Sequence, residues 1–236
     1  MKKTFLIALA ATALAAPAYA DHHSMSKAEH DKMHKEHSER LAKILADPAR
    51  GADAKRDQYR HPAETFEFFR LHPDHVIGEY APGGEWVSRI LGRYVNEKGK
   101  YTGLYFGTKS HFSDQQKTGI AAGIAKFPAD VAAVSGRPAT DFNAFSLSEI
   151  PDGAKGSFDR IIVMRMMHNM MNWNIADAEI KAMRDLLKDD GLLGIEQHRA
   201  KADAPFSYTN GTKGYMREAD IIKFMEVNGF ELVAKS

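Results

Sequence analysis

The sequence has no cysteine among its 236 residues. A chain without cysteine cannot form a disulfide, use a thiol as a nucleophile, hold an iron–sulfur cluster or attach haem through a CxxCH motif. It also lacks an excess of charge, because 32 basic and 31 acidic residues give a formal net charge of +1. A dedicated nucleic-acid-binding protein normally shows a strong basic excess, so we expect no nucleic-acid partner.

Long hydrophobic runs are also scarce. The run from about Phe5 to Ala16 is too short for a bilayer span, which needs roughly 20 apolar residues, and no later segment is apolar enough. Lys2 and Lys3 precede this run, and Ala18-Tyr19-Ala20 follows it with the small residues that signal peptidase recognises. These features predict a signal peptide over residues 1–20, cleavage after Ala20 and a periplasmic location. Retention of the run as an anchor is the alternative.

Histidines are concentrated after the predicted cleavage site. His30, His34 and His37 are spaced i, i+4, i+7, so a helix would present them on one face. Imidazoles at this spacing can bind zinc, copper or nickel, although no carboxylate–histidine pattern supplies a further ligand. Two interpretations remain open, a weak metal site and a solvated helical leader. We assign the leader to residues 21–48, where Asp47-Pro48 ends the helix, and the folded domain to residues 49–236.

Strand and helix patterns alternate from Arg56 onward. Short apolar runs bounded by turn residues predict strands, and apolar residues at helical spacing predict the helices between them. The expected strands are Val76–Tyr80, Lys100–Phe106, Phe142–Leu147, Phe158–Met164, Leu192–Gln197 and Phe230–Ala234, and the expected helices include Asp114–Lys126, Ala176–Leu187 and Glu218–Val227. This alternation predicts an α/β fold with a doubly wound, mostly parallel sheet covered on both faces.

Polar residues gather where three of these strands end. Glu79 lies near the end of the first strand, and Pro82-Gly83-Gly84 follows it with glycines that allow a ligand to approach the backbone. His168 and Asn169 follow another strand, and Glu196-Gln197-His198 follows a third. Ligands of doubly wound sheets bind beyond the carboxyl ends of the strands, so these side chains predict a binding crevice. A connecting turn and a packed loop, in which His168 only bonds a carbonyl, are the alternatives.

The motifs resemble, in the same order, the predicted secreted class I S-adenosylmethionine-dependent methyltransferases of proteobacteria. They are Arg56–Thr65, Glu79 with Pro82-Gly83-Gly84 and Trp86, Arg165 with His168-Asn169 and Trp173, and His198-Arg199. The likeness covers roughly Arg56 to Ser236. It implies a Rossmann-like sheet with a final antiparallel strand, S-adenosylmethionine at the glycine turn, and a small-molecule or protein methyl acceptor that the sequence does not identify.

The resemblance also implies roles for single residues. His168 would act as the catalytic base, and Asn169 would orient the methyl acceptor. The residues that would surround or cover the cofactor are Tyr59, Arg60, His61, Glu79, Ala81, Gly83 and Gly84.

Three features depart from the family pattern. Glu85 stands where the family usually has another glycine, and Tyr105-Phe106-Gly107 ends the second strand without the acid that binds the ribose hydroxyls. The chain stops at Ser236, just after the sixth strand, so we expect the closing strand to be missing and an unpaired sheet edge through which another chain could pair. Two functions therefore compete: a methyltransferase, and a catalytically degenerate periplasmic binding or interaction protein of the same fold, with or without metal on the leader.

Overall fold

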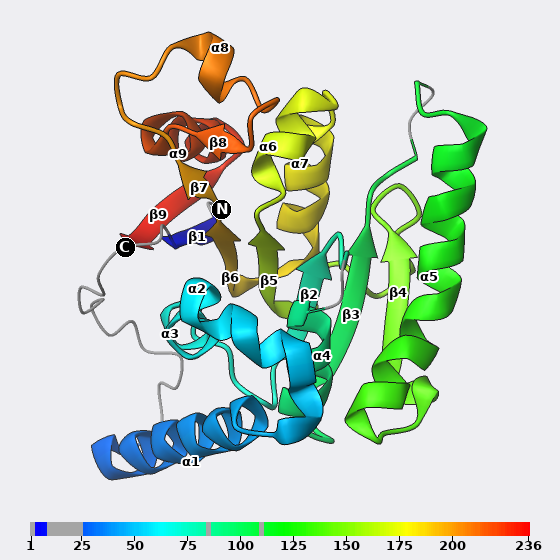
Figure 1. The fold of residues 1–236 in the computed structure, drawn as a ribbon, viewed down its shortest axis with the longest axis vertical. Helices are drawn as coiled ribbons and strands as arrows, with labels where there is room; N and C mark the ends of the chain where they lie inside the picture. Colours follow the sequence, from blue (N-terminus) through cyan, green and yellow to red (C-terminus); the bar gives the residue numbers. More distant parts are fainter. Residues whose placement is uncertain (1–2, 9–25, 84–85, 109–110) are drawn as a thin grey trace.

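The computed structural model describes residues 3–8, 26–83, 86–108 and 111–236. Its main strands are β1 (Lys3–Ala8), β2 (Val76–Tyr80), β3 (Lys100–Tyr105), β4 (Phe142–Ser146), β5 (Phe158–Met164), β6 (Leu187–Glu196) and β9 (Phe230–Lys235). They form one seven-stranded sheet in the order β4-β3-β2-β5-β6-β1-β9 (Figure 1), and its pairings are all parallel. The predicted α/β fold with a mostly parallel sheet is confirmed.

Helices cover both faces of this sheet. They are α1 (Lys27–Leu45), α2 (Asp57–Arg60), α3 (Pro62–Phe68), α4 (Trp86–Tyr94), α5 (Asp114–Ser135), α6 (Met167–Asn172), α7 (Ala176–Leu186), α8 (Phe206–Thr209) and α9 (Glu218–Val227). One hydrophobic cluster joins the sheet to α1, α3, α4 and α5, and another joins it to α6, α7 and α9. A small second sheet pairs β7 (His198–Arg199) with β8 (Tyr215–Met216). Within the described part of the chain, no helix has both the length and the hydrophobicity needed to cross a membrane.

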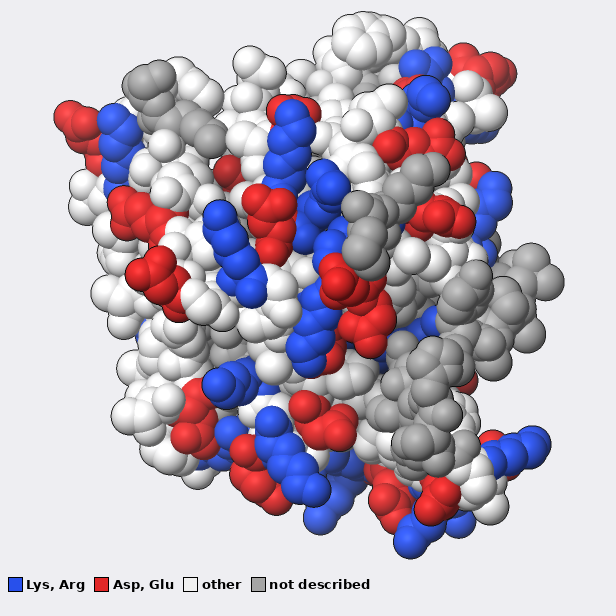
Figure 2. Space-filling view, turned by 180° about the vertical axis from the view of Figure 1, so that it is seen from behind, with Lys and Arg blue, Asp and Glu red and all other residues white. Residues whose placement is uncertain are grey.

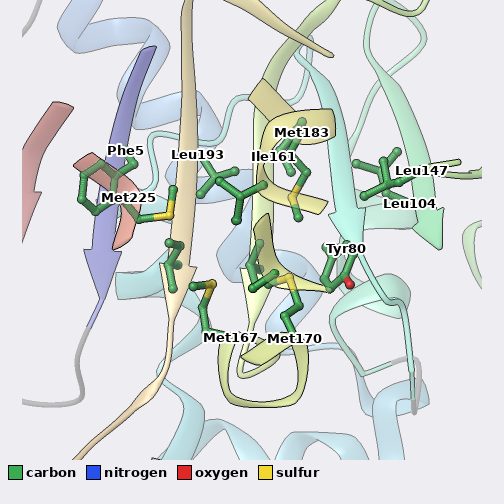
Figure 3. Close-up of a cluster of buried hydrophobic side chains, with 14 of the residues drawn as sticks. Phe5, Tyr80, Leu104, Leu147, Ile161, Met167, Met170, Met183, Leu193 and Met225 are labelled. Atoms are coloured by element: carbon green, nitrogen blue, oxygen red, sulfur yellow. The ribbon is translucent and has the colours of Figure 1, made fainter. Parts of the chain in front are cut away.

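Alternation along the strands divides the core between the two faces. In β5, Ile161 belongs to the cluster that packs on α6, α7 and α9, whereas Ile162 belongs to the other cluster. Figure 3 shows the cluster that packs on α6, α7 and α9, in which Met167 and Met170 of α6 lie near each other. Both methionines are fully buried, which agrees with the flexible, gap-filling role of this side chain in cores.

The N-terminal apolar run supplies the strand between β6 and β9. β1 pairs in parallel with β6 on one side and with β9 on the other, and Phe5, Leu6 and Ile7 are completely buried. Figure 3 shows Phe5 beside Met225 and Leu193. No antiparallel closing strand is present among the described residues, as expected. β1 lies in its place between β6 and β9, so the sheet edges are β4 and β9. The signal peptide over residues 1–20 stays a prediction, because a short apolar run suits either role.

The histidine-rich leader forms α1 and packs on the domain. Ser26 and Glu29 form a capping box at its start, while Leu41 near its end is buried. The Arg40 guanidinium donates hydrogen bonds to the carbonyl oxygens of Tyr94, at 2.6 Å, and Arg93, at 3.0 Å. The C-terminal half of α1 therefore belongs to the same packed body as α4.

Charge is mixed over the surface. On the face shown in Figure 2, basic and acidic side chains lie interspersed and form no large patch of one sign. Neighbouring helical residues pair in this way, for example Lys126 with Asp130 at 3.0 Å and Lys181 with Asp177 at 2.9 Å. This distribution agrees with the near-zero net charge of the sequence.

Candidate active site

The carboxyl ends of β2 and β5 lie side by side where the strand order of the sheet reverses. β3 and β4 extend from β2 in one direction, and β5 and β6 extend in the other. Ligands of doubly wound sheets bind at this point. The residues that directly follow β2 and β5, Ala81 and Arg165, have left-handed backbone conformations with φ of 52° and 56°. For a residue with a Cβ this conformation costs on the order of 1–3 kcal/mol, and such residues cluster at functional sites.

The turn after β2 leaves space next to the backbone. Among the described residues, a Cβ added to Gly83 would meet only the carbonyl oxygen of Ala81 within 4 Å, at the ordinary contact distance of 3.6 Å. The surrounding protein therefore does not require glycine at this position, whereas a ligand that approaches the backbone would benefit from it. Gly84 and Glu85 lie outside the described residues, so their expected effects stay predictions.

A cleft of about 410 Å³ opens next to this crevice, at the end of β6. It is lined by Lys55, Arg56, Tyr59, Arg60, Glu196, Gln197 and His198. Burial, together with the charge of Arg165, lowers the pKa of Arg60 and the pKa of His198. Arg165 forms an ion pair with Glu196, with 2.6 Å between Nη1 and Oε1. The basic groups outnumber the acidic one, so the cleft suits an anionic group on a ligand.

His168 lies in the first turn of α6, close to the end of β5. Its Nδ1 and its backbone nitrogen are 3.3 Å and 3.4 Å from Oε1 of Gln197. Nε2 of Gln197 donates a 2.6 Å hydrogen bond to the carbonyl oxygen of Gly214, so Oε1 is left as an acceptor. This assigns the proton of neutral His168 to Nδ1 and the lone pair to Nε2, as a general base requires. Nearby, the Asn169 amide lies 3.3 Å from the sulfur of Met166.

Comparison with known proteins identifies the fold. A scan against protein-family models and a search of curated proteins give no match. Among solved structures, an S-adenosylmethionine-dependent methyltransferase from Aquifex aeolicus superposes with a TM-score of 0.51, at 15% identity, over 80% of this chain and 87% of that one. The chain has a Rossmann-like fold similar to that of this solved structure. An arsenic(III) S-adenosylmethionine methyltransferase from Chlamydomonas reinhardtii aligns with a TM-score of 0.46, at 14% identity, over 66% of this chain and 52% of that one.

In this Rossmann-like fold, the carboxyl group of Glu79 has protein partners. Ser88 donates a 2.8 Å hydrogen bond to its Oε2, and the Tyr101 hydroxyl donates to the same oxygen. Burial raises the pKa of Glu79 to about 7, although both hydrogen bonds and the charge of Arg165 act in the opposite direction. The carboxyl group is held between β2, β3 and α4, and its contact with a cofactor stays a prediction.

A second buried carboxyl group lies at the end of β3, where the family pattern would have an acid that this sequence lacks. Glu179 of α7 is 1% exposed, and its Oε1 accepts a 3.0 Å hydrogen bond from the N–H of Gly107. Burial and the neighbouring Glu179 raise the pKa of Tyr80 well above its ordinary value. The sequence analysis missed Glu179, although it shares a helical face with Ile180 and Met183. A charged residue on an apolar face was the available signal.

The other predicted site residues do not lie together. Tyr59 and Arg60 line the cleft, whereas the exposed His61 lies outside its lining, 3.5 Å from Glu64. On α1, the His30 and His34 rings stack with centroids 6.4 Å apart.

His37 of the leader has a different environment. Its ring contacts His72, with 4.7 Å between the ring centroids. The structure therefore does not gather the three leader histidines around a common point.

Proposed function

We propose that this protein is an S-adenosylmethionine-dependent methyltransferase whose site is the crevice at the carboxyl ends of β2, β5 and β6. The observation that carries the proposal is the coincidence of three features at the switch point of a methyltransferase fold. They are the left-handed turns at Ala81 and Arg165, the open backbone at Gly83, and a histidine whose Nδ1 lies 3.3 Å from the side-chain oxygen of Gln197.

The residues of the crevice fit the cofactor. The guanidinium group of Arg60, which lines the cleft, suits the carboxylate of its methionine part, and the backbone at Gly83 allows close approach. When bound, S-adenosylmethionine supplies a methyl group on a positively charged sulfur. Glu179 fixes the amide of Gly107 and thereby orders the end of β3, where the family pattern has an acid for the ribose.

Residues of this chain would bind the methyl acceptor and remove one proton from it. Nε2 of His168 accepts the proton that an acceptor hydroxyl or amine loses, while Oε1 of Gln197 stays close to Nδ1–H. The oxygen of Gln197 thereby keeps the ring of His168 oriented, and Asn169 orients the acceptor. Alignment of the acceptor accounts for most of the catalysis expected from such a site. The acceptor is a small molecule or a protein.

Isothermal titration of the full chain with S-adenosylmethionine, and separately with S-adenosylhomocysteine, tests the proposal. We expect both to bind. Arg60→Ala removes a charge-assisted contact worth about 1.5–3 kcal/mol and should weaken binding at least roughly tenfold. Arg217→Ala is the matched control, because Arg217 pairs with Asp220 at the start of α9. Absence of binding at about 1 mM of either ligand, a free energy near −4 kcal/mol, would instead favour the cofactor-free interaction protein.

The location is a separate proposal. We place the mature protein in the periplasm, after cleavage behind Ala20, on the basis of the lysines, the apolar run and the small residues of the first twenty positions. N-terminal sequencing of protein from a periplasmic fraction should begin at Asp21. Intact protein that begins at Met1 and is found only in the cytoplasm would contradict this location.

A further inference from the structure

A cluster of metal-ligating side chains lies at the end of β2 opposite the crevice. His72 and His75 flank Asp74 in the turn before β2, and one potential ligand atom from each of the three lies within 4.8 Å of the others. The two imidazole rings stack with centroids 4.4 Å apart. Because β2 runs from this turn to Ala81, the cluster and the candidate active site lie at opposite ends of the strand.

The leader helix places a third imidazole next to this cluster. The ring of His37 contacts the ring of His72, with 4.7 Å between their centroids. α1 is held in this place by the buried Leu41 and by the hydrogen bonds of Arg40 to α4. The side chains therefore come from two elements that are already packed together.

The backbone that carries these side chains is fixed by hydrogen bonds. Asn96 N–H donates to the carbonyl oxygen of Pro73 at 2.8 Å, and Lys100 N–H donates to that of His75 at 3.0 Å. Nδ1 of His75 accepts the N–H of His72 at 3.3 Å, a long contact that a metal ion could replace. Such pre-organisation reduces the cost of binding an ion, because little backbone freedom remains to be lost.

We propose that His72, Asp74 and His75, together with His37, form a binding site for a divalent transition metal such as zinc, nickel or copper. Imidazole nitrogens combined with one carboxylate are preferred by these ions, whereas calcium and magnesium prefer oxygen ligands. Bonds of about 2.0–2.2 Å to a shared ion would require these ligand atoms, which lie within 4.8 Å of one another, to move closer together around it. The metal would link α1 to the turn before β2, and its role is to stabilise the docked leader rather than to take part in methyl transfer.

Zinc titration of the full chain tests this site, with binding measured calorimetrically and the melting temperature measured with zinc and with chelator. We expect zinc to bind wild type and raise its melting temperature. His72→Gln and His75→Gln should each weaken zinc binding roughly tenfold or more and abolish the thermal shift. Asp74→Asn, at an exposed position, gives a variant that retains the fold and should also bind zinc more weakly.

His30→Gln is the matched control, because His30 lies on the same helix but stacks on His34 rather than on His72. It should leave zinc affinity unchanged, whereas His37→Gln should lower it. The proposal is overturned if wild type binds no zinc at about 1 mM, or if His30→Gln loses as much affinity as His72→Gln. Circular dichroism in the presence of chelator establishes whether each variant is folded. If a histidine variant is unfolded, its loss of zinc binding is disregarded and the result for Asp74→Asn decides.

Discussion

Glu79 and Glu179 bring two carboxyl groups into the interior on opposite sides of the sheet. Glu79 lies with Ser88 and Tyr101 on the α4 side, and Glu179 lies with Gly107 on the α7 side. Burial disfavours the charged form of a carboxyl group, and hydrogen bonds donated to it compensate only in part. Each residue therefore holds a strand end in place at a cost in stability, and for Glu79 this cost depends on pH.

Replacing Glu79 with Gln should make stability less dependent on pH. Burial raises the pKa of Glu79 from 4.5 to about 7, so the folded state keeps a proton that the unfolded chain releases. The stability that this proton contributes is fully present below the unfolded pKa and is lost as the pH rises towards 7. Over this range wild type should lose up to about 3 kcal/mol of unfolding free energy relative to Glu79→Gln. Urea denaturation at a series of pH values measures the difference.

The exposed Glu231 provides the control for this experiment. Glu231→Gln should reproduce the pH dependence of wild type, because its side chain is exposed to solvent in the folded protein. Parallel stability curves for wild type and Glu79→Gln would show that Glu79 does not exchange a proton on unfolding in this range.

The tautomer of His168 is a direct test of its assignment as a base. Nitrogen-15 NMR of the neutral ring should show the proton on Nδ1, because Oε1 of Gln197 is the acceptor there. Gln197→Glu retains an acceptor oxygen and should preserve this tautomer, whereas Gln197→Leu should allow the proton to move to Nε2. A proton on Nε2 in wild type would remove the lone pair on which base catalysis by His168 depends.

Elements with a strong apolar pattern could be predicted from the sequence almost to the residue. β5 and α9 have the expected bounds, since a continuous apolar run and a helix followed by Asn228-Gly229 leave little ambiguity. α5 continues past its expected end at Lys126 to Ser135 and contains Pro128, because packing on β4 and α4 outweighs the local cost of proline. The short helix α6 was missed, as six residues are too few to show a helical period.

The sequence also predicted which residues group at the candidate site, but not their individual contacts. Parallel strands end at one edge of a sheet, so the grouping of polar strand ends followed from the pattern alone. The contacts of side chains with distant elements could not be predicted in this way, and the contact of Glu179 with Gly107 was therefore missed. The turn His72–His75 was expected only to break a helix, since its approach to His37 depends on the packing of α1. Local sequence patterns hold no information on such contacts.

Truncation of Phe5 tests whether β1 is an integral strand. Phe5 is completely buried and packs edge-on against Phe230 of β9, with ring centroids 6.2 Å apart. Phe5→Ala should lower the unfolding free energy by about 3–5 kcal/mol, as expected for a large buried side chain. Val227→Ala is a suitable control, because Val227 is 68% exposed, and it should change stability by no more than about 0.5 kcal/mol. Equal stability of the two variants would show that β1 is not packed in the folded protein.

For the molecule as a whole, residues 3–8 bear on both the fold and the proposed periplasmic location. The same apolar segment is a buried strand between β6 and β9 and part of the predicted signal peptide. Without cysteine, no disulfide can compensate for the loss of this strand outside the cytoplasm. Cleavage after Ala20 would therefore leave a mature protein whose stability rests on the remaining α/β core.

Comparison of the full chain with residues 21–236 measures this cost. Removal of Phe5, Leu6 and Ile7 forfeits about 1.5–3 kcal/mol of hydrophobic stabilisation for each, so the shorter chain should be less stable by roughly 5 kcal/mol or more. It should bind the dye ANS at the exposed faces of β6 and β9, and a synthetic peptide of residues 1–12 should reduce this binding and restore stability by filling the strand position. Equal unfolding free energies and no response to the peptide would mean that β6 and β9 close on each other once β1 is removed.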